Sequence, residues 1–126
     1  GHGTLDMVGA LMHSCDVYFY DIAGRIGMDR IADMARRFGL GGKVGLELPG
    51  ERPGLIPDPK WKRQALKQPW HQGETLIASM GQGYVLTTPL QLAVMTARLA
   101  SGRAVQPHLL KSIEGQFAET TEWPAI

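Results

Sequence analysis

The first third of the chain has hydrophobic residues at helical spacing. Between residues 31 and 38 they recur at i, i+3, i+4 and i+7, which places them on one face of a helix. A similar pattern occurs twice before this stretch, so we expect three helices within residues 4–39. Capping residues and glycines set their expected limits: a helix capped by Thr4, a helix from about Asp16 to Ile26 that Gly27 closes, and a helix that Asp29 caps and Gly39 ends.

The middle of the chain has a different pattern. Glycine and proline are frequent over residues 40–83, which predicts a loop region because proline interrupts regular elements. Apolar residues alternate with others over residues 44–48, which indicates a short strand or extended segment. One or two helical turns are expected over residues 59–66, since Asp58 can cap them and Pro59 suits the first helical position.

The last third contains the most strongly specified helix. Thr88 is a good N-cap, Pro89 suits the first position, and Gln91 stands where a capping box requires it. We therefore expect a helix over residues 88–101, closed by a glycine. Residues 104–113 have a strand-like pattern, and the tail over residues 114–126 has little pattern. The expected fold class is mainly α with short β segments.

Composition narrows the classes of protein that fit. The chain has 126 residues, 44% hydrophobic and 20% charged, which predicts a folded protein of at most one domain. A formal net charge of +1 gives no reason to expect nucleic-acid binding. No apolar run is long enough to span a membrane, and the single cysteine excludes an internal disulfide. The basic cluster Lys60, Lys62, Arg63 and Lys67 is interpreted as a solvated face, with a binding surface for peptidoglycan or a partner as the alternative.

The tripeptide Ser14-Cys15-Asp16 is the first candidate for chemistry. It lies between an expected helix end and an aromatic helical run, so its hydroxyl and carboxylate can face a cleft side by side. A Ser-x-Asn/Asp step is the second of three motifs in serine acyl-transfer enzymes of the penicillin-binding and β-lactamase type. By itself the tripeptide is weak, because a simple helix N-cap gives the same pattern.

A second landmark makes the assignment specific. Residues 81–84 read Gly-Gln-Gly-Tyr, and residues 88–93 read Thr-Pro-Leu-Gln-Leu-Ala. Together with Ser14-Cys15-Asp16, in this order, they resemble the transpeptidase domain of class B penicillin-binding proteins, of the elongation type. The resemblance runs from about residue 1 to 112 and implies that the chain is a piece of the α/β penicillin-binding/β-lactamase-like transpeptidase fold.

The resemblance implies a function for the whole protein. Enzymes of this family cross-link peptidoglycan stem peptides through a serine acyl-enzyme, without a catalytic cofactor, and are the targets of β-lactam antibiotics. An elongation-type member would work beside a membrane glycosyltransferase, at the periplasmic face of the bacterial inner membrane. No serine here is followed three residues later by lysine, and no Lys-Ser/Thr-Gly step is present. We therefore expect this chain to be inactive alone, because the nucleophile and the third motif are missing from it.

The resemblance also implies roles for two residues. Ser14 corresponds to the serine of the second motif, whose hydroxyl can donate and accept a proton. Asp16 corresponds to a position that is asparagine in much of the superfamily. An ionised aspartate accepts hydrogen bonds but donates none, so Asp16 is expected to hold the ammonium of the missing lysine rather than bind the peptide.

A metal site and a scaffold role are further hypotheses. Some elongation-type members carry a structural zinc bound by two aspartates, a histidine and a cysteine. The resemblance matches His2 and Cys15 to the last two ligands, and both aspartates would precede Gly1. From the residues alone, a flexible terminal histidine and a buried thiol remain the alternative. Gly81, Gln82 and Gly83 are expected to support the floor of the site, with the glycines letting the backbone pass close beneath the helix that carries Ser14.

Two expectations concern other properties of the chain. Trp61, Trp70 and Tyr84 are expected to pack under the long loop, with glycan stacking as the alternative. Exposed core surface would favour self-association of the chain. The rival to an enzyme is a non-catalytic helical interaction module of a cell-wall assembly complex, which would have kept the scaffold and lost the chemistry.

Overall fold

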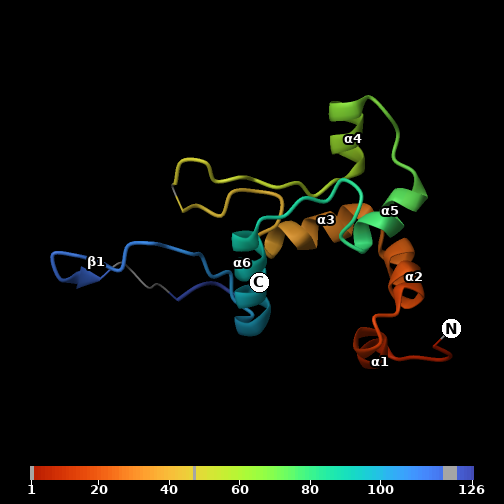
Figure 1. Cartoon of the computed structure of the whole chain (residues 1–126), viewed down its shortest axis with the longest axis horizontal. Helices are drawn as coiled ribbons and strands as arrows, with labels where there is room; N and C mark the ends of the chain where they lie inside the picture. The colour runs from red at the N-terminus through yellow and green to blue at the C-terminus, as the bar shows by residue number, and fades with distance from the viewer. Residues whose placement is uncertain (1, 47, 118–121) are drawn as a thin grey trace. The chain divides into compact units, whose positions relative to one another are not determined.

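The computed structural model describes residues 2–46, 48–117 and 122–126. Its elements form two compact units, one made of Gly1–Asp33 with Pro57–Val85 and the other of Met34–Ile56 with Leu86–Ile126. Helices outnumber strands in the described part of the chain, as expected for this fold class (Figure 1). No helix among the described residues is both long and apolar enough to cross a bilayer.

The first unit begins with two consecutive helices. Helix α1 covers Met7–Met12 and helix α2 covers Asp16–Ile26, which agrees with the expected second helix. Thr4 was wrongly assigned as the cap of α1. The cap is Asp6, whose carboxylate accepts a hydrogen bond from the Gly9 amide at 2.8 Å. A carboxylate two residues further along satisfies an amide that Thr4 is too far away to reach.

Two more helices complete the first unit. Helix α4 covers Pro59–Leu66, and Asp58 caps it as expected by accepting from the Trp61 amide at 2.7 Å. Helix α5 covers Gln72–Ser79 and lies in the segment for which we expected only loop. It packs along α2 (Figure 1). A Cβ added at Gly24 of α2 would lie 3.4 Å from the side chain of Gln72, which is an ordinary van der Waals contact.

Helix α3, Met28–Arg37, begins in the first unit and ends in the second. Asp29 lies within its first turn rather than at its cap, so the helix begins two residues before the expected start. Its end agrees with the expectation. Gly39 has a φ of 95°, and the amides of Gly39 and Leu40 donate to the carbonyls of Arg36 and Ala35. These paired bonds define a Schellman motif.

The second unit is built around helix α6, Pro89–Ser101, which confirms the most strongly specified element. Its expected capping box is present. The backbone amide of Gln91 donates to Thr88 Oγ1, and the side-chain oxygen of Gln91 accepts from the backbone amide of Thr88, both at 3.1 Å. The Gln91 side chain is 1% exposed. Its Nε2 donates to the carbonyls of Gly42 and Pro53, so one buried amide fixes both ends of the intervening loop.

Strands are fewer than expected. The only ladder among the described residues pairs β1, Ser112–Ile113, with β2, Gln116–Phe117, in antiparallel register. The expected strand over 104–113 is therefore confined to its last two residues, and β2 lies in the expected tail. The segment 44–48 is not a strand at its described residues, while residue 47 and the tail residues 118–121 lie outside them. Isolated bridges pair Leu55 with Leu86 and Arg103 with Ala125.

Candidate active site

Ser14 lies at the junction between α1 and α2. The amide of Ser14 donates to the Leu11 carbonyl at 3.2 Å, and the amide of Cys15 donates to the Ala10 carbonyl at 2.9 Å. This is again the hydrogen-bond pattern of a Schellman motif, with Ser14 at the position that Gly39 occupies after α3. Ser14 accordingly has a φ of 48°, in the left-handed region that glycine normally fills.

The next two residues start α2. Cys15 is the N-cap of α2 and is buried, whereas Ser14 and Asp16 on either side of it are exposed. Asp16 is in the first turn of α2, where its carboxylate interacts favourably with the helix dipole. The simple N-cap interpretation of Ser14 is wrong, because the N-cap is Cys15 and Ser14 belongs to the end of the preceding helix.

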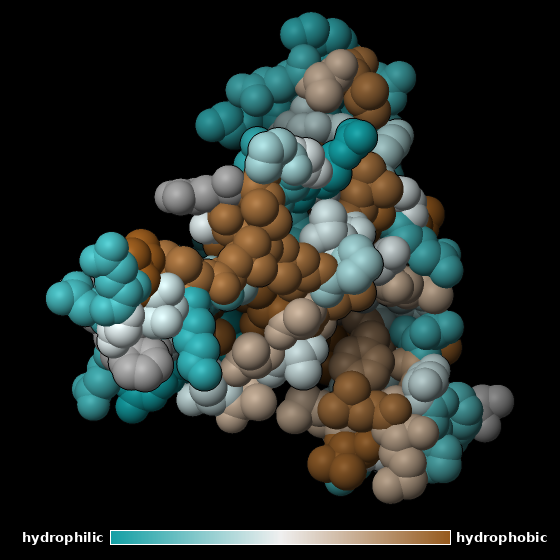
Figure 2. All heavy atoms as spheres, turned by 60° about the vertical axis from the view of Figure 1, so that its left-hand side comes forward, coloured by the Kyte–Doolittle hydropathy of each residue, from teal (hydrophilic) through white to brown (hydrophobic). Residues whose placement is uncertain are grey.

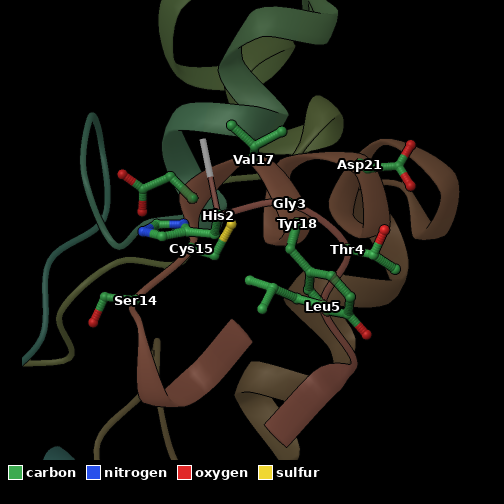
Figure 3. A pocket seen from close by; sticks show the side chains of 10 residues that line it. His2, Gly3, Thr4, Leu5, Ser14, Cys15, Val17, Tyr18 and Asp21 are labelled. Atoms are coloured by element: carbon green, nitrogen blue, oxygen red, sulfur yellow. The ribbon is translucent and has the colours of Figure 1, made fainter. Parts of the chain in front are cut away.

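Ser14, Cys15 and Asp16 line one open hollow of about 830 Å³. Figure 3 shows that its remaining wall comes from the segment before α1 and from the first turns of α2. The hollow is large enough for a peptide segment, and its size and openness distinguish it from a packing defect. Its other lining residues are His2, Gly3, Thr4, Leu5, Val17, Tyr18 and Asp21.

The two proposed zinc ligands lie in the same hollow. His2 and Cys15 both line it, and the imidazole of His2 also stacks on that of His13, with ring centroids 5.8 Å apart. Among the described residues, no group of three or more His, Cys, Asp or Glu side chains could hold a metal ion. Imidazole and thiolate are the right donor types for zinc, but a structural site needs four ligands.

The Gly81-Gln82-Gly83 turn follows α5. Gly81 and Gly83 have φ values of 76° and 70°, so positive φ explains both glycines. The expected reason, a close passage beneath the Ser14 helix, is wrong: a Cβ on Gly81 would meet nothing within 4 Å, and one on Gly83 would meet only Ile77 of α5. The turn is nevertheless linked to α2, because the hydroxyl of Tyr20 donates to the sulfur of Met80.

Lys62 does not belong to a solvated face. Its side chain is 4% exposed and its ammonium forms an ion pair with Glu74, which connects α4 to the first turn of α5. The other members of the basic cluster, Lys60, Arg63 and Lys67, are exposed as expected. Burial raises the pKa of Glu74, but hydrogen bonds from Lys62 and from the His71 amide outweigh it and hold that pKa below its usual range. The Glu74 carboxylate is therefore ionised at neutral pH.

The aromatic residues of the first unit pack against neighbours. The rings of Trp61 and Tyr84 lie 5.1 Å apart, and the indole of Trp70 donates to Thr75 Oγ1 at 2.9 Å. The first contact joins α4 to the residue that follows the glycine turn, and the second joins the loop before α5 to α5 itself, which gives these residues a structural role.

The tripeptide thus lies at the junction of α1 and α2 and lines an open hollow. Residues 1–125 match the family described as "Penicillin binding protein transpeptidase domain", and the chain belongs to that family. It is 46% identical over 116 residues to "Peptidoglycan D,D-transpeptidase MrdA" of Acinetobacter baumannii, covering 91% of this chain and 17% of that protein. The chain thus spans less than a fifth of the length of this relative.

Solved structures give the same result. The crystal structure of Pseudomonas aeruginosa PBP2 in complex with WCK 5153 has a TM-score of 0.88 and 45% identity, covering 97% of this chain and 27% of that one. The complex between PBP2 and MreC from Helicobacter pylori has a TM-score of 0.82 and 37% identity, covering 94% of this chain and 22% of that one. The resemblance to elongation-type penicillin-binding proteins, and specifically to penicillin-binding protein 2, is confirmed.

Proposed function

We propose that the whole protein is a peptidoglycan D,D-transpeptidase and that this chain supplies one side of its active site. The observation that carries the proposal is the exposed Ser14-Cys15-Asp16 step, held between two helices at an open hollow, in a chain of the transpeptidase family. The substrate would be the stem peptide of peptidoglycan, and β-lactams would acylate the same enzyme.

The reaction needs a nucleophilic serine and a lysine that this chain lacks. The serine oxygen attacks the carbonyl carbon of the penultimate D-alanine, the peptide bond to the terminal D-alanine breaks, and the leaving nitrogen takes up a proton. An amine of a neighbouring stem peptide then attacks the acyl ester, which forms the cross-link and returns the proton to the serine oxygen. Water is neither consumed nor released in this exchange.

Ser14 and Asp16 have distinct roles in this scheme. The exposed Ser14 hydroxyl relays the proton to the leaving nitrogen, because a hydroxyl can accept and donate at once. The Asp16 carboxylate accepts a hydrogen bond from the lysine ammonium and so influences its protonation. An asparagine at position 16 would remove the negative charge while keeping the size of the side chain.

Labelling of the full-length protein with fluorescent penicillin tests the assignment. Ser14→Ala should slow acylation by about a hundredfold, at the lower end of the range that general acid–base groups contribute. Asp16→Asn should slow it by less, about tenfold, because it removes a charge beside the lysine rather than a proton-transfer group. Asp21→Asn is the matched control, because Asp21 lines the same hollow but is exposed and paired with Arg25. Wild-type labelling rates in both the Ser14 and Asp16 variants would remove the catalytic assignment and favour the non-catalytic interaction module.

A structural zinc is the second part of the proposal. His2 and Cys15 would supply two of its four ligands, and the other two would come from outside this chain. Zinc bound there would supply no chemistry to acyl transfer and would tie the segment before α1 to the start of α2. The full-length protein should contain about one zinc per chain, and Cys15→Ser should lose it. Equal zinc content in wild type and Cys15→Ser would exclude this site.

The relatives support a proposal for the partner and the location of the whole protein. A structure described as "Structural coordination of polymerization and crosslinking by a peptidoglycan synthase complex" resembles this chain with a TM-score of 0.84 and 38% identity, covering 97% of this chain and 21% of that one. By analogy, we expect the whole protein to work with a membrane glycosyltransferase at the periplasmic face of the inner membrane. Co-purification of the full-length protein with a glycan polymerase tests this partner.

A further inference from the structure

A basic hollow in the second unit has no role in the acyl transfer described above. It has a volume of about 260 Å³, and its lining contains three cationic side chains and no acidic one. The rest of the lining is the glycine-rich segment that follows α3. The lining residues are Arg36, Gly39, Leu40, Gly41, Gly42, Lys43 and Arg98.

Arg98 is held in position by neutral acceptors. Its Nε donates to the Val105 carbonyl at 3.0 Å, and its Nη1 donates to the Arg37 carbonyl at 2.8 Å. Neither carbonyl carries a full charge. The end of α3, to which Arg37 belongs, contributes a partial negative charge of about one half, which offsets only part of the guanidinium charge. Arg98 is thus pre-organised, and its acceptors offset the guanidinium charge only in part. The Glu51 carboxylate does not line the hollow, but it accepts from the amide of Val44, next to Lys43.

Lys43 adds a cation whose charge no acidic side chain in the hollow offsets. The side chain is exposed, and no ion pair of Lys43 occurs within the described part of the chain. Lys43 and Arg98 therefore offer an ammonium and a planar guanidinium to the same space, and these are the groups that proteins use for oxyanions. Arg36 lines the hollow as well, but the inference does not depend on it.

The glycine-rich segment exposes its backbone to the hollow. Gly39 and Gly41 have φ values of 95° and 77°, and a Cβ on them would lie 2.9 Å from Val94 and 3.0 Å from Ile56. These positions therefore exclude larger residues. Within the described residues, the amides of Gly41 and Gly42 donate to no acceptor of the protein. Backbone amides in such turns can bind anions together with nearby cations.

We propose that this hollow binds a phosphoryl group, held by Lys43, Arg98 and the backbone amides of the glycine-rich segment. A phosphoryl group carries up to two negative charges and several acceptor oxygens, so it can use the ammonium, the guanidinium and the amides together. A lone carboxylate has one charge and two oxygens and fits fewer of these donors. The group could be carried by a lipid headgroup or by a soluble phosphate, and both present the same chemistry.

Titration of the full-length protein with inorganic pyrophosphate tests the proposal. Lys43→Met should weaken binding by about tenfold, whereas Lys43→Arg should change it by about twofold or less, because the charge is kept. Lys60→Met is the matched control, since Lys60 is exposed on α4 in the other unit. Raising the salt concentration from about 50 to about 200 mM should weaken wild-type binding, as screening requires.

Two further measurements distinguish a lipid headgroup from a soluble phosphate and test this proposal independently of the transpeptidase proposal. Lys43-dependent association with micelles that contain phosphatidylglycerol, but not phosphatidylcholine, would indicate a lipid headgroup. Pyrophosphate binding without that association would indicate a soluble phosphate. Penicillin labelling of Lys43→Met should stay at the wild-type rate. Absence of saturable pyrophosphate binding to the wild type, or equal affinity in Lys43→Met and Lys60→Met, would overturn the proposal.

Discussion

At the scale of single residues, the most informative feature is the backbone of Ser14. Helices α1, α3 and α5 all end in the same Schellman hydrogen-bond pattern, and of the three only α1 has a residue other than glycine at the left-handed position. A left-handed conformation costs a non-glycine residue about 1 kcal/mol or more. Such a cost is commonly retained at functional sites. Lys67 and Glu114 also have a positive φ, so this backbone conformation does not assign a function by itself. The proton relay proposed above for the Ser14 hydroxyl would explain a serine where glycine would be more stable.

This interpretation predicts opposite effects on stability and activity at position 14. Ser14→Gly should stabilise the α1–α2 junction by about 1 kcal/mol relative to Ser14→Ala, because only glycine relieves the left-handed backbone. Both variants should lose penicillin labelling to the same extent, since both lack the hydroxyl. Amide hydrogen exchange of residues 7–26 in the full-length protein measures the difference. Equal protection in the two variants would show that the conformation carries no cost.

The sequence supplied candidate residues for this site but not their geometry. Ser14 and Asp16 were recognised because their spacing belongs to a known motif. The left-handed φ of Ser14 was not foreseeable, because a serine at that position gives no signal of the kind that Gly39 gives. The burial of Lys62 was missed for a similar reason, since its partner Glu74 lies twelve residues away and on another helix.

At the scale of elements, capping chemistry explains which helices were predictable. Helix α6 was predicted closely because Thr88, Pro89 and Gln91 all specify its start. Helix α5 was missed because Gly73 and Thr75 lower helix propensity and a proline-rich stretch precedes it. A signal was present nevertheless. Glu74 stands at the third position and its carboxylate accepts from the His71 amide at 2.7 Å, as in a capping box.

The ion pair between α4 and α5 predicts that substitutions of its two members lower stability to different extents. Glu74→Gln should destabilise the two helices by about 3 kcal/mol, because it leaves the buried Lys62 ammonium without its counter-charge. Lys62→Met should cost much less, since an apolar chain of similar length fills the same space. Protection of α4 and α5 amides in hydrogen exchange gives both values. A larger loss in Lys62→Met than in Glu74→Gln would contradict this account.

The same pair predicts a pH dependence. The folded pKa of Glu74 lies below its value in the unfolded chain, for which 4.5 is the reference. Its contribution to stability is therefore complete above pH 4.5 and is lost as the pH falls through the folded pKa. The difference in protection between wild type and Glu74→Gln should shrink when the pH is lowered below 4.5. A difference that grows on acidification would reverse the sign of the assigned shift.

Gln91 predicts how the loop over residues 42–53 is held. Gln91→Glu should lower stability more than Gln91→Met does, because a buried carboxylate would face the Gly42 and Pro53 carbonyls to which the side-chain amide now donates. We expect losses of about 2 kcal/mol for methionine, which leaves these carbonyls unpaired, and more for glutamate. Exchange of amides in the loop reports the effect, with Gln106→Glu as a control on an exposed glutamine. Equal exchange in the two Gln91 variants would argue against the amide as the anchor.

At the scale of the whole molecule, the described surface is unusually rich in apolar side chains. The hydropathy colouring of Figure 2 shows hydrophobic residues at the surface, and helix α1 is an extreme case. Only Ala10 is buried in it, while Met7, Val8, Leu11 and Met12 are each more than half exposed. The periodicity of the sequence correctly predicts helices with apolar faces. It cannot tell whether these faces meet one another or a part of a longer protein.

This surface predicts that one substitution has opposite effects in two contexts. Because the chain spans less than a fifth of its relative MrdA, we expect the remainder of a full-length protein to cover α1. In the isolated 126-residue chain, Met12→Lys should reduce self-association and binding of a hydrophobic dye, since Met12 is 73% exposed there. In the full-length protein the same change should destabilise the fold by about 2 kcal/mol or more, because a charge replaces a buried thioether. Lys60→Met is the reciprocal control, because it replaces an exposed charge by an apolar side chain. If Met12→Lys does not change the stability of the full-length protein, α1 is exposed to solvent there as well, and the prediction is wrong.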